Sequence, residues 1–326
     1  MSNQIVFHSS LSNIFYSYIA EKHALGYSFN KGESMLKRFD SFLQTKNHSD
    51  ISLPKEIVIE WCKQSPNETV NNRLHRISLL RGLAEYMNRV GYSAYIFPKR
   101  MVTVDRYAYQ PYIFSNEEMR RILTVCDNYP PSEVSPYRHK IIPLIIRVLY
   151  GCGLRISEAV KLKKDDVDLK NGTFFIKKTK FNKQRIIPIA NSLLQRCREY
   201  YKEVVMKNPD NEYFFPSPYG GHLNTGTVYG WFRDIFWRAG ISHTGKGPRL
   251  HDLRHVFAVT CLKNCIRKGR DLPNCLAYLS VYLGHEDIRG SQRYLRLTSE
   301  LYPDIVESIE TNCAWIIPEV KHNETN

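Results

Sequence analysis

The 326-residue sequence has no long apolar run and no leader pattern at its start. A helix needs about 20 consecutive apolar residues to span a bilayer. The opening MSNQIVFHSS has no charged stretch followed by an apolar one. Internal repeats, heptads and low-complexity tracts are also missing, which excludes a solenoid or a coiled coil. These absences predict a cytoplasmic protein that makes no membrane contact.

The eight cysteines are irregularly spaced and form no CxxC pair. In a chain without a secretion signal, such cysteines are expected to be free thiols. Neither a disulfide framework nor a zinc ribbon is therefore predicted.

Positive charge is in excess, since 46 Lys and Arg against 32 Asp and Glu give a formal charge of +14. The excess is +5 within residues 1–100 and +9 in the remainder. With 43% hydrophobic and 24% charged residues, the composition is that of a folded protein. A folded basic chain of this length is expected to form about two domains and to bind a polyanion. Without a membrane segment, the predicted partner is nucleic acid.

Apolar residues recur at helical spacing from about Leu11 to Val90, and breaks rich in Gly, Asn and Pro divide this stretch into four helices. Three arginines of the last helix, Arg73, Arg76 and Arg81, are placed largely away from its apolar side and are candidates for DNA contact. An ordinary solvated face is the alternative. The boundaries predicted are a helical DNA-binding domain over 1–100 and an extended, tyrosine-rich linker over 101–113.

The remaining segment, 114–326, combines helices with one short β region. Ser115 and Glu118 match the capping box of a helix start. The β-prone runs 173–177 and 184–189 predict an antiparallel hairpin with the loop 178–183. The fold class expected for the chain is mainly α with a small antiparallel β-sheet.

Six side chains suited to phosphodiester chemistry occur in four short motifs of this segment. They are Arg155, Lys180, His251, Arg254, His285 and Tyr294. Two guanidinium groups can bind the oxygens of one phosphate, and a tyrosine can attack it and keep a covalent link to one DNA end. Because Glu158 follows Arg155 by three positions, its carboxylate can orient that guanidinium. His251 and Arg254 have the same spacing on a helix predicted to start near Leu250.

In this order, the motifs LYGCGLRISEAVKL, TKFNKQRIIPI, LHDLRH and YLGHEDIRGSQRYLRL resemble those of the tyrosine recombinase, or phage integrase, family. The resemblance covers roughly Phe114–Thr298. It implies a tyrosine recombinase catalytic domain over 114–326, preceded by a helical, SAM-like core-binding domain. The hairpin departs from the family pattern, because Thr179-Lys180-Phe181 stands where members often have Gly-Lys-Gly.

The resemblance also implies a role for each of these side chains. Arg155 and Arg254 would bind the scissile phosphate, with Glu158 in support. Lys180 would protonate the leaving 5′ oxygen, and His251 would exchange a proton with the nucleophile Tyr294. His285 would support the phosphate.

The activity implied is site-specific recombination of double-stranded DNA through a 3′-phosphotyrosine, without metal or other cofactor. Its setting would be the integration, excision or transposition of a mobile element. Four protomers would assemble on two DNA sites and exchange a C-terminal segment, for which Ser299–Thr311 is the candidate. The alternative for this segment is a helix packed on its own domain.

Other interpretations use the same residues. A type IB topoisomerase-like enzyme would share the nucleophile and relax DNA, and a DNA-binding regulator would keep the fold without turnover. A metal site could use His251 and His255 with Cys261, Cys265 or His285, although HExxH and CxxC are missing. The cluster Asp165, Asp166 and Asp168 could suggest a two-metal nuclease, but the turn that follows favours a solvated loop.

Overall fold

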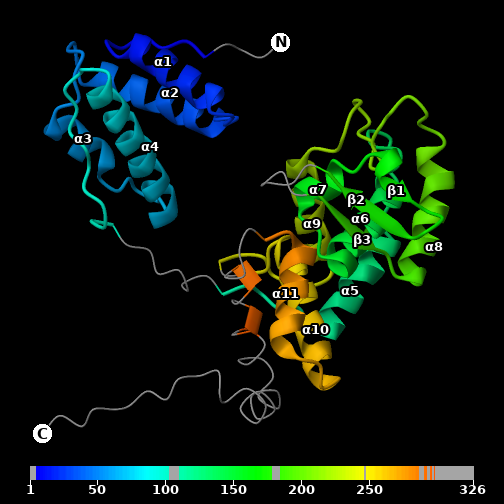
Figure 1. Ribbon diagram of the computed structural model, residues 1–326. Helices are drawn as coiled ribbons and strands as arrows, with labels where there is room; N and C mark the ends of the chain where they lie inside the picture. The colour runs from blue at the N-terminus through cyan, green and yellow to red at the C-terminus, as the bar shows by residue number, and fades with distance from the viewer. Residues whose placement is uncertain are drawn as a thin grey trace, which may run out of the picture. The chain divides into compact units, whose positions relative to one another are not determined.

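The computed structural model describes residues 5–102, 110–177, 184–245, 247–285, 290, 291, 294, 295 and 297. The chain divides into two compact units, Met1–Gln110 and Pro111–Asn326 (Figure 1). The division falls inside the predicted linker. Lys180 and the segment Ser299–Thr311 lie outside the described residues.

The first unit contains the four helices that the sequence predicts. They are α1 (Ser12–Ala24), α2 (Asn30–Thr45), α3 (Lys55–Cys62) and α4 (Val70–Arg89). Thr69 caps α4 by accepting a hydrogen bond from the Asn72 main-chain N–H at 3.3 Å. The core of the unit is rich in aromatic side chains, including Phe15, Phe39 and Trp61.

In the second unit, a small sheet follows the first three α-helices in the sequence and precedes the last four. Its α-helices are α5 (Asn116–Asp127), α6 (Arg138–Cys152), α7 (Ile156–Val160), α8 (Asn191–Tyr200), α9 (Thr225–Arg238), α10 (Asp252–Arg267) and α11 (Leu272–Leu283). A 3₁₀ turn, η1 (Lys164–Asp166), precedes the sheet, and a π-helical turn, η2 (Tyr201–Val205), extends α8. The capping box predicted at Ser115 and Glu118 is present at the start of α5.

The sheet consists of β1 (Val167–Asp168), β2 (Thr173–Ile176) and β3 (Arg185–Pro188), in that order and antiparallel. Strands β2 and β3 form the predicted hairpin, with Ile176 opposite Arg185 at its open end. Strand β1 was not predicted, because its two residues are too short a run to show alternation.

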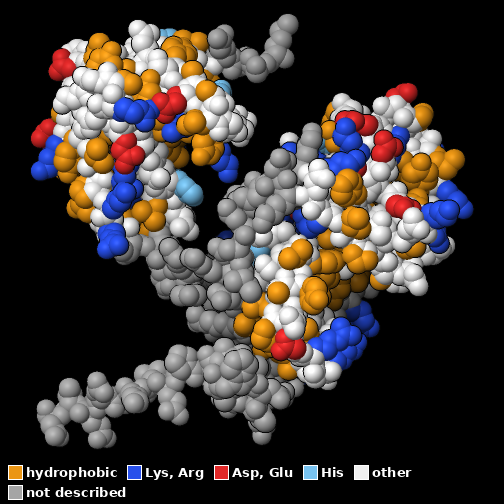
Figure 2. Space-filling model, in the orientation of Figure 1, with side chains coloured by type: hydrophobic (Ala, Val, Ile, Leu, Met, Phe, Trp, Pro, Cys, Tyr) orange, Lys and Arg blue, Asp and Glu red, His pale blue; other side chains and the backbone are white. Residues whose placement is uncertain are grey.

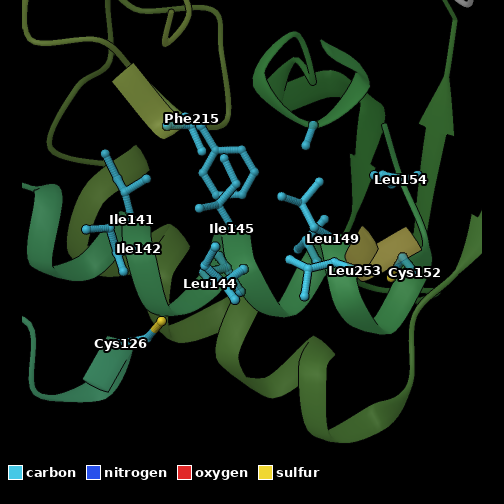
Figure 3. Packing of buried hydrophobic residues seen from close by; sticks show 14 of the residues in the cluster. Cys126, Ile141, Ile142, Leu144, Ile145, Leu149, Cys152, Leu154, Phe215 and Leu253 are labelled. Carbon is cyan, nitrogen blue, oxygen red and sulfur yellow. The ribbon is translucent and has the colours of Figure 1, made fainter. Parts of the chain in front are cut away.

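Helix α6 lies at the centre of the second unit and packs against α5, α8 and α10. Residues all round this helix are buried, as a helix inside a core requires. Figure 3 shows Ile141, Ile145 and Leu149 among the packed apolar side chains. A second apolar cluster joins α10 and α11 and includes Tyr294. Thus the C-terminal ends of α6 and α11 are both supported by packed cores.

The structure confirms a mainly α fold with a small antiparallel sheet. Figure 2 shows Lys and Arg side chains on both units, with Asp and Glu among them. None of the helices in the described ranges has the length and apolar character needed to cross a membrane.

The free-thiol prediction is wrong for Cys265 and Cys275, which form a disulfide between α10 and the first turns of α11. The chain reverses direction between these helices, so two cysteines ten positions apart are brought together. Irregular sequence spacing does not show such a reversal. Five other cysteines are free thiols, namely Cys62, Cys126, Cys152, Cys197 and Cys261.

Candidate active site

Two helix ends, both terminated by glycine, define the candidate site. Gly153 follows α6 with φ 60°, and Gly284 follows α11 with φ 64°. Glycine adopts this left-handed conformation without steric cost, and it commonly ends helices for this reason. A Cβ on Gly153 would also lie 2.5 Å from Cδ1 of Phe257. The two glycines thus allow the last carbonyl groups of α6 and α11 to face side chains from other elements.

Three guanidinium groups donate hydrogen bonds to three consecutive carbonyls at the end of α11. The contacts are Arg185 Nε to Tyr282 O at 2.7 Å, Arg254 Nη2 to Leu283 O at 2.5 Å, and Arg155 Nη2 to Gly284 O at 3.1 Å. Arg254 Nη1 also reaches Gly153 O at 2.7 Å. The last carbonyls of a helix lack intrahelical donors and carry partial negative charge. This helix end can therefore hold several cations close together.

Glu158, in α7, supplies the anionic group of the cluster. Its carboxylate accepts from the Arg155 main-chain N–H at 2.9 Å and from Arg155 Nη1 at 2.8 Å. It also accepts from both Nη atoms of Arg185, at 3.1 and 2.8 Å. Burial by itself raises the pKa of Glu158, but the hydrogen bonds and charge of Arg185, followed by the hydrogen bonds from Arg155, lower it below the ordinary value. The carboxylate is therefore ionised and orients Arg155, as the spacing predicts.

Arg254 lies at the centre of the cluster and is only 2% exposed. Burial, followed by the charge of Arg155, lowers its pKa from 12.5 to about 10. The group is still protonated at neutral pH. It is held as a buried cation by carbonyl oxygens from two helix ends.

A row of aromatic rings lies beside the arginines. Tyr294 is 3% exposed, and its ring centroid is 5.5 Å from that of His255 and 6.0 Å from that of His285. The rings of His251 and His255 are 4.9 Å apart. His285 Nδ1 lies 2.7 Å from the hydroxyl oxygen of Ser291. Two imidazole rings, those of His255 and His285, therefore lie next to the phenol ring.

The structure brings together most of the residues predicted from the sequence. Arg155, Glu158 and Arg254 meet at the end of α11, which leads directly into His285. Tyr294 adjoins His285, and His251 is connected to Tyr294 through the ring of His255.

The sequence did not predict that Arg185 and His255 lie in the candidate site. For Arg185 a signal was present, because alternation along a strand places it on the same buried face as Ile187. A charged residue at an inward strand position needs partners inside the fold. His255 lies in α10, one turn after the N-cap residue His251, and the sequence alone suggests for it only a metal-ligand role.

The three arginines proposed to contact DNA from α4 are engaged inside the first unit. Arg76 is 4% exposed and bonds the carboxylate of Glu68 and carbonyls at the end of α3. Arg73 Nε donates to Cys62 O at 2.9 Å, and Arg81 Nε donates to Phe97 O at 2.9 Å. The prediction that Arg76 lies away from the buried side is wrong, because a long side chain can bridge to the neighbouring helix end.

No group of three or more potential ligands (His, Cys, Asp or Glu) that could hold a metal ion occurs within the part of the chain that the structure describes. Asp166, considered for a two-metal site, is buried and ion-paired with Lys177. Asp168 accepts from the main-chain N–H groups of Lys170 and Asn171 at 2.9 and 2.8 Å, which is the arrangement of a turn.

Known proteins resemble this chain in both sequence and fold. The family model described as the phage integrase family matches residues 113–300. The chain is 30% identical to the putative integrase/recombinase y4rE of Sinorhizobium fredii, over 85% of this chain and 89% of that protein. It is 27% identical to the tyrosine recombinase XerC of Oceanobacillus iheyensis, over 86% of this chain and 88% of that protein. The crystal structure of the XerH site-specific recombinase bound to its palindromic difH substrate matches with a TM-score of 0.65 at 21% identity, over 95% of this chain and 85% of that one.

Proposed function

The chain belongs to the phage integrase family of tyrosine recombinases, and on this premise we propose that it cuts and rejoins double-stranded DNA through a 3′-phosphotyrosine on Tyr294. The observation that carries the proposal is the meeting of Arg155, Arg254 and His285 at one helix end, with the Tyr294 ring beside them. These groups combine a phosphate-binding set with a nucleophile.

Phosphate binding is assigned to Arg155 and Arg254. A guanidinium has five N–H groups, so phosphate oxygens can be bound beside the carbonyl contacts or in their place. Positive charge fixed before the reaction stabilises the extra negative charge that develops on the phosphorus oxygens. The helix end keeps two like-charged groups together until DNA arrives.

The proposed cleavage step forms a bond between Tyr294 Oη and phosphorus while the bond from phosphorus to the 5′ oxygen breaks. The phenol proton passes to His251, and the departing 5′ oxygen receives a proton from Lys180. Rejoining is the reverse reaction with a 5′ hydroxyl from a partner duplex. Each step conserves a phosphodiester, so no nucleotide is consumed.

Access to the site requires a change on DNA binding. Tyr294 and Arg254 are only 3% and 2% exposed. A phosphodiester cannot reach atoms that neighbouring side chains cover. We therefore include in the proposal that DNA binding exposes Tyr294, which would restrict cleavage to assembled complexes.

DNA binding by the first unit is proposed for a groove between α2 and α4. The exposed side chains of Lys31, Arg38 and His75 line it. Cations that neutralise phosphates supply most of the affinity for DNA and make it dependent on salt. In this proposal the second unit is the catalytic domain, and four protomers pair two DNA sites at the ends of a mobile element.

A nicked suicide substrate tests the nucleophile, because loss of the short 5′ fragment prevents rejoining and traps the covalent adduct. The wild-type chain is expected to give an adduct that Tyr294→Phe abolishes. Tyr278→Phe, at a position 77% exposed on α11, is the control and should keep the adduct. An adduct that persists in Tyr294→Phe would move the nucleophile to another residue.

The suicide substrate and a supercoiled plasmid together separate the other activities. A regulator without turnover gives no adduct with any DNA. A topoisomerase-like enzyme relaxes supercoiled plasmid of any sequence as a monomer, whereas a recombinase forms adducts at paired specific sites.

A further inference from the structure

Arg185, the first residue of β3, has a buried guanidinium whose contacts with the described residues lie inside the protein. Its side chain is 7% exposed. Both Nη atoms bind the carboxylate of Glu158, and Nε binds the carbonyl of Tyr282. This forked arrangement uses the planar geometry of arginine, which a lysine ammonium cannot reproduce.

The partner carboxylate is shared between two arginines. Glu158 receives two hydrogen bonds from Arg185 and two from Arg155, and its side chain is 2% exposed. If Arg185 were absent, both carboxylate oxygens would turn to Arg155. The Arg155 guanidinium would then rotate toward Glu158 and away from the carbonyl of Gly284.

The second anchor of Arg185 is the end of α11. Its bond to Tyr282 O is the first of the three arginine contacts to consecutive carbonyls, and the Arg155 bond to Gly284 O is the last. A Cβ on Gly284 would be 3.0 Å from Arg185 Nη1, so the glycine also permits this close approach. Arg185 therefore restrains both the carboxylate and the helix end that hold Arg155.

We propose that Arg185 is a positioning residue for DNA cleavage, which holds Glu158 and the end of α11 so that the Arg155 guanidinium faces the scissile phosphate. This inference rests on the proposed function. It gives a role to Arg185, a residue that is not among those proposed to contact DNA. Arg185 acts through Arg155, so its loss weakens the compensation of phosphate charge.

The experiment compares cleavage of two suicide substrates by the full-length chain. One has an ordinary scissile phosphate, and the other has a methylphosphonate, in which a methyl group replaces a charged oxygen. Arg185→Lys should slow cleavage of the phosphate by roughly 10- to 100-fold, the range expected when a functional group is displaced. On the uncharged methylphosphonate the loss should be several-fold smaller, since less charge needs compensation. General destabilisation would slow both substrates equally.

Arg147→Lys is the matched control. Arg147 likewise forks onto a carboxylate, that of Asp127, and donates to the carbonyl of Pro143. Its replacement should change neither cleavage rate. Glu158→Gln provides a second variant if Arg185→Lys does not fold, and it should show the same selective loss on the charged phosphate.

The outcomes distinguish the two proposals. If wild type forms no adduct, the proposed function is wrong. If wild type cleaves and Arg185→Lys cleaves both substrates at wild-type rates, or loses both equally, the positioning role is wrong. If Arg185→Lys is unfolded, an equal loss on both substrates in Glu158→Gln would likewise reject it.

Discussion

The imidazole of His285 lies almost parallel to the phenol ring of Tyr294, with ring centroids 6.0 Å apart and an interplanar angle of 20°. Burial, followed by the charges of Arg254 and Arg155, lowers the pKa of His285 to about 4. The ring beside Tyr294 is therefore neutral at physiological pH. It can donate one hydrogen bond to a phosphate oxygen without adding a fourth cation to the arginine cluster.

The low pKa of His285 predicts a loss of stability in acid. An unfolded histidine titrates near pH 6.5, whereas the folded group titrates near pH 4. Between these values the unfolded state binds the proton better, so stability that is complete above about pH 6.5 declines as the pH falls toward 4. Thermal unfolding should show this decline in wild type and a smaller one in His285→Gln. A His285 proton NMR titration near pH 6.5 in the folded chain would contradict the expectation.

Gly153→Ala should reduce both stability and cleavage. The new Cβ would be 2.5 Å from Phe257, and a left-handed φ costs a non-glycine residue about 1–2 kcal/mol. The shift should also displace the carbonyl that binds Arg254. Gly151→Ala, inside α6, is the control, because its nearest contact would be an ordinary 3.7 Å. In urea unfolding, Gly151→Ala should be as stable as wild type or slightly more stable, and it should form the adduct normally. Equal effects of the two substitutions would refute this explanation.

In the first unit, replacing Arg76 should affect stability, whereas replacing Arg38 should affect DNA binding. Arg76→Ala breaks a buried ion pair with Glu68 and should lower the free energy of unfolding by about 3 kcal/mol. Arg38→Ala, at an exposed position, should change stability by less than about 0.5 kcal/mol. It should instead weaken DNA binding and reduce the salt dependence by about one counterion. Binding measured across a salt series checks this, and an unchanged slope would remove Arg38 from the DNA surface.

Lys180→Ala should slow cleavage by at least about a hundredfold, because the leaving 5′ oxygen loses its proton donor. A 5′-phosphorothiolate needs little protonation to leave, so it should restore the rate of this variant. Lys183→Ala is the control and should cleave the ordinary substrate normally. Rescue seen for Lys183→Ala and not for Lys180→Ala would assign the general acid to the other lysine.

Local patterns in the sequence predict much of the fold. The hairpin predicted over 173–177 and 184–189 corresponds to β2 and β3, because alternation is a property of neighbouring residues. The contact of Arg155 with Glu158 is also local, since three positions separate them on one helical turn. Predictions failed where the same local pattern is compatible with both a solvated and a buried position. On α4, Arg76 occupies a position that suits a solvated face, yet its guanidinium binds the end of α3.

The helices, the hairpin, the positive charge and the chemical identity of the groups that can act on a phosphodiester follow from patterns of neighbouring residues. Which of these groups meet depends on how distant parts of the chain pack. Arg155 binds Gly284 across 129 positions, and Arg254 binds Gly153 across 101. Such pairs depend on how α6, α10 and α11 pack, and periodicity along the chain contains no record of that packing. The common end of α11, where three arginines converge just before His285, is the product of tertiary structure.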